Sequence, residues 1–225
     1  MLEHVYERVS QARYLSRVVI ATDDQRIYDE ARRFRASVRM TREDHLSGTD
    51  RVAEVASAEE AEFIVNVQGD EPLIDPLAID AAILPLLDEP DIPMGTLKKR
   101  IENPREISDP NVVKVVTDLN GRAIYFSRST LPFPRRDVNE PVVHYKHIGL
   151  YVYQRDFLLG YSDLPVGPLE KAERLEQLRA LENGYKIHVE ETEYESLGVD
   201  TPDDLERVNG LMEAFAAQTK MHGED

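Results

Sequence analysis

The sequence has 225 residues, of which 41% are hydrophobic and 31% charged, so we expect a single globular domain over residues 1–225 with a substantial core. Acidic residues outnumber basic ones by 43 to 27, and the net charge of −16 argues against a nucleic-acid-binding protein. The absence of cysteine excludes disulfides and thiolate chemistry, and no apolar run reaches bilayer length. We therefore predict a cytoplasmic protein without membrane insertion.

Short apolar runs alternate with helical patterns, which is typical of an α/β fold whose mostly parallel sheet is covered on both faces. Residues 63–67 are apolar apart from Asn66 and precede a polar loop, so we expect this strand in the centre of the sheet. The first half of the chain is predicted to contain helices over 2–14, 24–34 and 76–87, and strands over 18–21, 38–40 and 63–67.

The second half is predicted to contain a hairpin, because strand-like residues 112–117 and 123–126 flank the turn Asp118–Gly121. Residues 144–153 alternate in polarity, over a length that could carry a strand beyond the sheet. The remaining expected elements are a helix over 169–183 that ends at Gly184, a strand over 187–190, and a helix over 202–217 capped by Thr201.

The start of the chain departs from the usual order of a nucleotide-binding domain. Such α/β domains begin with a strand, and the loop after it binds phosphate. Here the first pattern is helical, with Leu2, Val5 and Val9 on one face. We therefore expect a fold in which the first strand is missing.

Two aspartates lie where α/β sheets bind ligands. Asp70 follows the strand at 63–67, and Asp200 follows a short apolar stretch and precedes a helix. A carboxylate at this edge can hold Mg²⁺ against a triphosphate. The alternative for each is structural, because a loop aspartate often caps a turn or helix.

Other polar residues suggest ligand contacts, although each has a structural alternative. Ser47, Gly48 and Thr49 form a loop that could bind a base or sugar through backbone groups, or could simply cap a helix. His147 shares a strand face with Tyr151. Lys114 interrupts an apolar strand, where an unpaired ammonium would be costly. Kinase, dehydrogenase, zinc-protease and serine-hydrolase motifs are absent from the sequence.

Taken in order, these stretches resemble the 3-deoxy-manno-octulosonate (Kdo) cytidylyltransferases, also called CMP-Kdo synthetases. The resemblance extends over nearly the whole chain, and the ordered set is far more specific than any single run. The matching runs are MTREDHLSGTDR, FIVNVQGDEPLI, DPNVVKVV, GRAIYFSRSTLP, HYKHIGLYVY, GPLEKAERLEQLRALENGYKIHV and GVDTPDDLERV.

The resemblance implies a Rossmann-like nucleotidyltransferase fold and a role for each matching residue. It implies that Asp70 and Asp200 are the catalytic acids that bind Mg²⁺, and that the segment around 144–153 forms a protruding dimerisation hairpin. The implied nucleotide-binding residues are Ser47, Gly48, Thr49 and Arg51. The implied Kdo-binding residues are Gln68, Arg128, His147, Tyr151, Glu176 and Gln177.

The implied reaction transfers a cytidylyl group from CTP to Kdo for lipopolysaccharide biosynthesis, in a homodimer. The sequence departs from the family at its start. Family members have a phosphate-binding loop before the first helix, and this loop has no match here, because Met1–Val5 matches the helix that follows the loop. The sequence is then either a shortened version of a longer protein or a natural short form, and we expect very weak turnover without the loop. The alternatives are transfer to another acid sugar, such as sialic acid, and an inactive dimer that binds nucleotide or sugar.

Overall fold

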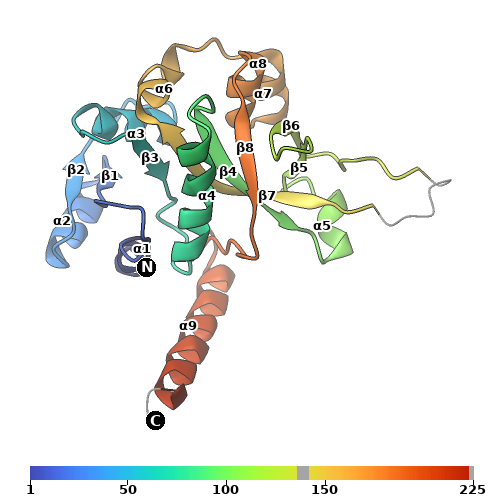
Figure 1. The fold of residues 1–225 in the computed structure, drawn as a ribbon. Coiled ribbons are helices and arrows are strands. Elements are labelled where there is room, and N and C mark those ends of the chain that lie inside the picture. The colour runs from blue at the N-terminus through green and yellow to red at the C-terminus, as the bar shows by residue number, and fades with distance from the viewer. Residues whose placement is uncertain (136–141, 223–225) are drawn as a thin grey trace.

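The computed structural model describes residues 1–135 and 142–222, with side chains as far as residue 213. Within these residues the strands form a two-stranded sheet, β1–β2, and a six-stranded sheet in the order β6-β5-β7-β4-β8, with β3 paired to β7 (Figure 1). The strands are β1 (Ile20–Thr22), β2 (Val38–Met40), β3 (Phe63–Asn66), β4 (Met94–Arg100), β5 (Lys114–Thr117), β6 (Ala123–Ser127), β7 (Tyr145–Gln154) and β8 (Ile187–Glu191).

Helices lie on both faces of the larger sheet, as the alternating pattern predicts (Figure 1). They are α1 (Leu2–Val9), α2 (Gln25–Arg33), α3 (Gly48–Ser57), α4 (Pro76–Asp88), α5 (Pro104–Ser108), α6 (Arg155–Leu159), the 3₁₀ helix η1 (Tyr161–Asp163), α7 (Pro168–Glu173), α8 (Gln177–Glu182) and α9 (Pro202–His222). In the described part of the chain, no helix combines the length and the apolar character that a membrane span requires.

The core has two parts, one on each face of the larger sheet. On one face, apolar side chains of α1 and α4 pack against β4 and β7, where Ile148, Leu150 and Val152 are buried. On the other face, α6, η1 and α8 pack against Met94, Phe126 and strand residues around them. Because neighbouring side chains of a strand point to opposite faces, β7 contributes to both parts.

Strand β7 is the centre of the larger sheet and makes it mixed in direction. It pairs antiparallel with β4, and its other edge pairs with β3 and, at Lys146, with β5. Parallel pairing holds for β1–β2 and β4–β8, so the prediction of a mostly parallel sheet needs correction to a mixed one. Residues 144–153 also lie inside the sheet. The segments that project from the body are instead those on either side of residues 136–141 (Figure 1).

Several elements differ from the prediction: the helix expected over 2–14 ends at Val9, and α5 and α6 were not expected. For two further differences the structure shows a physical reason. Strand β4 was not expected, because its sequence MGTLKKR has a glycine near its start and charges at its end, yet residues 94–97 are fully buried. The helix predicted over 169–183 is instead two helices, because Arg174 adopts a left-handed backbone with φ of 52° and separates α7 from α8, while the predicted end before Gly184 is confirmed. The break is held from outside the segment, since Arg128 donates to the carbonyl oxygen of Glu173 at 2.8 Å. The predicted lack of a first strand stays a prediction.

Candidate active site

The structure brings the two predicted metal-binding segments together at one edge of the larger sheet. Asp70 lies in the loop after β3, and the backbone N–H of Val199 donates to its carbonyl oxygen at 3.0 Å. A methyl group added at Gly198 would lie 3.8 Å from Oδ2 of Asp70. Asp200 is exposed directly beyond this contact, and Asp70 is half-buried. The backbones of the two segments therefore lie in contact, while the metal-binding role of the two carboxylates stays a prediction.

Helix α9 begins immediately after Asp200, as expected from the Thr201 cap. The Thr201 hydroxyl accepts the backbone N–H of Asp204 at 3.2 Å, and the Asp204 carboxylate accepts the backbone N–H of Thr201 at 3.0 Å. This reciprocal pair is a capping box, which fixes the direction in which the chain enters the helix. The capping box therefore fixes the backbone on the C-terminal side of Asp200.

The loop at residues 47–49 lies against Glu176, which the sequence placed in a different subsite. Ser47 caps α3 by accepting the backbone N–H of Asp50 at 3.2 Å, so the structural alternative for this loop also holds. Ser47 and Thr49 donate hydroxyl hydrogen bonds to the two carboxylate oxygens of Glu176, at 3.2 and 3.1 Å. Burial raises the pKa of Glu176, and the Thr49 hydroxyl opposes that rise.

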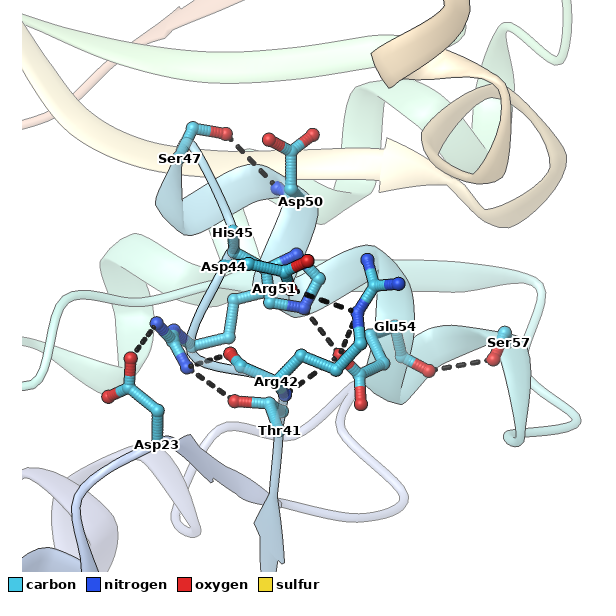
Figure 2. A network of polar contacts seen from close by, with 10 residues as sticks. All are labelled: Asp23, Thr41, Arg42, Asp44, His45, Ser47, Asp50, Arg51, Glu54 and Ser57. Atoms are coloured by element: carbon cyan, nitrogen blue, oxygen red, sulfur yellow. Dashed lines mark hydrogen bonds and ion pairs between the residues drawn. The ribbon is translucent and has the colours of Figure 1, made fainter.

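Arg51 braces this loop. Its guanidinium donates to the carboxylate of Asp23 at 2.5 Å and to the hydroxyl of Thr41, so it joins α3 to the ends of β1 and β2 (Figure 2). Nearby, the His45 ring contacts the carboxylate of Glu54, whose pKa this contact lowers. The guanidinium predicted to bind nucleotide is therefore already paired within the protein.

His147, Tyr151 and Gln177 form a connected group on one face of β7. The rings of His147 and Tyr151 lie 5.4 Å apart, and the Tyr151 hydroxyl donates to Oε1 of Gln177 at 3.2 Å. Nε2 of Gln177 is buried and has no hydrogen-bond partner among the described residues. Such an unpaired donor is costly unless a ligand supplies an acceptor.

His147 is held as a neutral ring. Its Nε2 lies 2.9 Å from the Thr96 hydroxyl, and burial lowers its pKa to about 3 by disfavouring the charged imidazolium. Over the same face of β7, where a methyl group added at Gly149 would lie 2.7 Å from Nε2 of Gln68, the side-chain amide of Gln68 donates to the carbonyl oxygen of Gly149 at 3.3 Å. The register between β4 and β7 shifts here: Thr96 is opposite Tyr151 and Leu97 is opposite Ile148, so Gly149 and Leu150 of β7 have no partner on β4.

Arg128 is not joined to this group by its described hydrogen bonds. Its guanidinium donates to the carbonyl oxygens of Glu173 and Pro110, at 2.8 and 2.9 Å. Lys114, the buried ammonium in β5, donates to the carbonyl oxygens of Asp109 and Val112, at 2.7 and 2.5 Å. Its expected cost is thus offset by backbone acceptors.

Comparison with known proteins identifies the family. The cytidylyltransferase family matches residues 1–187. The 3-deoxy-manno-octulosonate cytidylyltransferase of Solibacter usitatus is 71% identical, over 99% of this chain and 88% of its own. The chain belongs to the 3-deoxy-manno-octulosonate cytidylyltransferase family. The enzyme of that name from Geobacter sulfurreducens is 58% identical, over 92% of this chain and 87% of its own.

A solved structure supports the same assignment. CMP:2-keto-3-deoxy-manno-octonic acid synthetase complexed with CTP superposes with a TM-score of 0.90 at 42% identity, over 95% of this chain and 87% of that one. The predicted family and its nucleotidyltransferase fold are confirmed. The individual roles of the site residues in this cytidylyltransferase stay predictions.

The edge of the sheet where the Asp70 and Asp200 segments meet offers carboxylate oxygens, which are ligands that Mg²⁺ prefers in phosphate-binding enzymes. In the described residues, no group of three or more His, Cys, Asp or Glu side chains is arranged to hold a metal ion. Mg²⁺ in nucleotide-processing sites is commonly held by one or two carboxylates together with substrate phosphates and water. The Asp70 and Asp200 segments at one edge fit this type of site rather than an all-protein cage.

Proposed function

We propose that this family member transfers a cytidylyl group from CTP to Kdo, with CMP-Kdo and pyrophosphate as products. The observation that carries the proposal is the meeting of the Asp70 and Asp200 segments in a chain 71% identical to a named Kdo cytidylyltransferase. The superposed synthetase was solved in complex with CTP, which supports CTP as the nucleotide here. Lipopolysaccharide biosynthesis and a cytoplasmic location stay predictions.

The mechanism requires positioning more than covalent chemistry. The anomeric hydroxyl of Kdo attacks the α-phosphorus of CTP, and pyrophosphate leaves. Asp70 and Asp200 would hold Mg²⁺, which when bound neutralises phosphate charge and lowers the pKa of the attacking hydroxyl. The neutral His147 ring orients the sugar by hydrogen bonding without adding charge. The unpaired Nε2 of Gln177 is available to an oxygen of the sugar acid.

The arrangement of Glu176 supports a link between the nucleotide and sugar subsites. Its carboxylate holds the hydroxyls of the 47–49 loop, and the next residue, Gln177, belongs to the His147 group. Arg51 then acts by bracing the loop through Asp23 rather than as a free cation. The two substrates would meet across the start of α8.

We also propose a homodimer. The segments on either side of residues 136–141 project from the body, and Phe133 on one of them is 81% exposed (Figure 1). The sheet strand β7 itself is paired on both edges and is not available for such a contact.

The function is tested by measuring pyrophosphate release from CTP. We expect Mg²⁺-dependent release with Kdo, much slower release with N-acetylneuraminate, and none after chelation with EDTA. Faster release with N-acetylneuraminate would favour the alternative acid sugar. Tight CTP or Kdo binding without any release would favour the alternative of an inactive binding protein.

Gly149→Ala is expected to weaken Kdo binding while the fold stays intact. The added methyl group would lie 2.7 Å from Nε2 of Gln68, so this flexible side chain must move away from the sugar site. Loss of one hydrogen bond of ordinary strength corresponds to a rise in the KM for Kdo of about 2- to 10-fold. Steady-state kinetics with saturating CTP measures this change.

The matched control is Gly160→Ala. Its methyl group would meet only ordinary contacts, the nearest at 3.8 Å, and it is remote from Gln68 in sequence. We expect its KM for Kdo to equal that of the unmodified protein. An unchanged KM in Gly149→Ala would remove Gln68 from the proposed sugar contacts.

A further inference from the structure

The stretch that carries Asp200 has no regular secondary structure. Residues 192–200 lie between β8 and α9 and belong to no helix or strand, although the backbone N–H of Thr192 still donates to the carbonyl oxygen of Lys98 at 2.9 Å. Their path is therefore set by side-chain contacts and single backbone bonds. Glu195 contacts Lys146 at 2.5 Å and Lys99 at 3.3 Å on one side of the stretch.

On the other side, the stretch is clamped by Glu71. The Tyr194 hydroxyl donates to Oε2 of Glu71 at 2.9 Å, and the Ser196 hydroxyl donates to Oε1 at 2.6 Å. Both carboxylate oxygens of Glu71 are thus used, and the side chains of Glu71 and Tyr194 are buried. Hydrogen bonds to a buried carboxylate are strong because water does not compete for them.

The clamp lies next to the proposed metal edge. Glu71 directly follows Asp70, and the clamped Ser196 is close in sequence to Val199, whose N–H bonds to the carbonyl oxygen of Asp70. A shift of the stretch would therefore move Asp200 relative to Asp70. The geometry and affinity of a metal site depend on such supporting contacts.

From this arrangement, and resting on the proposed function, we infer that Glu71 is a positioning residue for the divalent cation. Through Tyr194 and Ser196 it fixes the stretch that carries Asp200 against Asp70. Sequence patterns did not reveal this role, because Glu71 is far in the chain from Tyr194 and Ser196 and resembles an ordinary loop acid. The carboxylate touches neither substrate nor cation in this role.

The first test needs no metal and no substrate. Hydrogen exchange at the Val199 amide, measured by NMR, is expected to become at least about tenfold faster in Glu71→Gln, because the side-chain amide cannot accept from both hydroxyls. The double variant Tyr194→Phe, Ser196→Ala removes the two hydroxyl donors instead of the acceptor. It should increase the exchange rate of the Val199 amide by the same factor. It keeps Glu71, so it guards against an effect of Glu71→Gln on folding alone.

The control is Glu170→Gln. Glu170 is also a buried carboxylate, but it pairs with Arg179 at 2.7 Å in the α7–α8 region. We expect it to lower the thermal unfolding temperature without changing exchange at Val199. Unchanged exchange in Glu71→Gln, or an equal increase in Glu170→Gln, would overturn the inference.

The second test measures Mn²⁺ binding in the presence of CTP by electron paramagnetic resonance. Glu71→Gln is expected to raise the Mn²⁺ dissociation constant about tenfold, in the range found for supporting residues of metal sites. Adding Tyr194→Phe and Ser196→Ala to it should weaken binding no further, because all three changes break one contact.

Asp70→Asn separates the positioning role of Glu71 from the cation site itself. Loss of Mn²⁺ binding in Asp70→Asn but not in Glu71→Gln would overturn the inference and leave the proposed function standing. Binding that is equal in both variants and the unmodified protein would instead overturn the proposed cation site. The exchange rate of Val199 would then still decide whether Glu71 holds the stretch.

Discussion

Asp70→Asn is expected to lower the rate of pyrophosphate release from CTP and Kdo by about 10²–10³-fold, the usual cost of removing one electrostatic contact from a catalytic site. The change replaces a charged oxygen ligand with a neutral amide at the edge where the segment of Asp200 approaches. Mg²⁺ depends on carboxylate ligands and on charge neutralisation, so the substitution acts on turnover more than on the fold.

Asp75→Asn is the matched control for this change. Asp75 lies in the same loop and caps α4 by accepting the backbone N–H of Leu77 at 2.9 Å. Asparagine caps helices about as well as aspartate, so this variant should keep both its stability and its turnover. Normal turnover in Asp70→Asn would remove the metal role of that residue, and a matching loss in Asp75→Asn would point to the loop as a whole.

Gly95→Val is expected to lower the free energy of unfolding by about 1–3 kcal/mol, the usual cost of overpacking a core. A Cβ at this position would lie 2.6 Å from Cδ1 of Leu86 and 3.1 Å from the carbonyl oxygen of Ala82. Leu86 is fully buried and cannot swing into solvent, and the oxygen belongs to the backbone of α4. Chemical denaturation monitored by circular dichroism measures the loss.

Gly210→Ala provides the opposite case. Gly210 lies within α9, and an added methyl group there meets no heavy atom within 4 Å. Alanine favours a helix over glycine by up to about 1 kcal/mol, so this variant should be slightly more stable. If Gly95→Val were as stable as the unmodified protein, β4 and α4 would not pack as closely as described.

The part of the fold that could be predicted rests on local signals. The strand expected over 38–40 is β2, and the helix expected over 76–87 is α4, which begins at a proline preceded by a capping aspartate. The hairpin at residues 118–121 is also correct, because its turn chemistry is contained within the turn. Each of these elements is determined by residues that are neighbours in sequence.

The elements that could not be predicted are determined by distant residues. Strand β4 is stabilised by pairing with β7 and β8 on either side, although its own sequence is nearly half charged. The break at Arg174 is held by contacts with the segment around Arg128, and no glycine or proline marks it. Tertiary contacts override local preference in both cases.

The residues of the candidate site also fall into two groups, those that local sequence predicts and those that depend on contacts between distant residues. Asp70 could be placed from the sequence because it follows a strand, although β3 proves to be half-buried and pairs only with β7 among the described strands, and Asp200 because it precedes a helix cap. The resemblance to the Kdo cytidylyltransferases selected these residues from other acids, and the family is now confirmed. The contact of Glu176 with the 47–49 loop, and the pairing of Arg51 with Asp23, join residues that no sequence pattern connects.

The small sheet of β1 and β2 is expected to be less stable against local opening than the main sheet. Among the described residues these strands form a ladder only with each other, so they are expected to open at a lower free energy than the main sheet. Arg51 anchors the 47–49 loop to Asp23 and Thr41 at the ends of these same strands. A nucleotide bound to this loop would therefore make the β1–β2 sheet more rigid. The free-energy cost of that ordering would reduce the observed binding affinity.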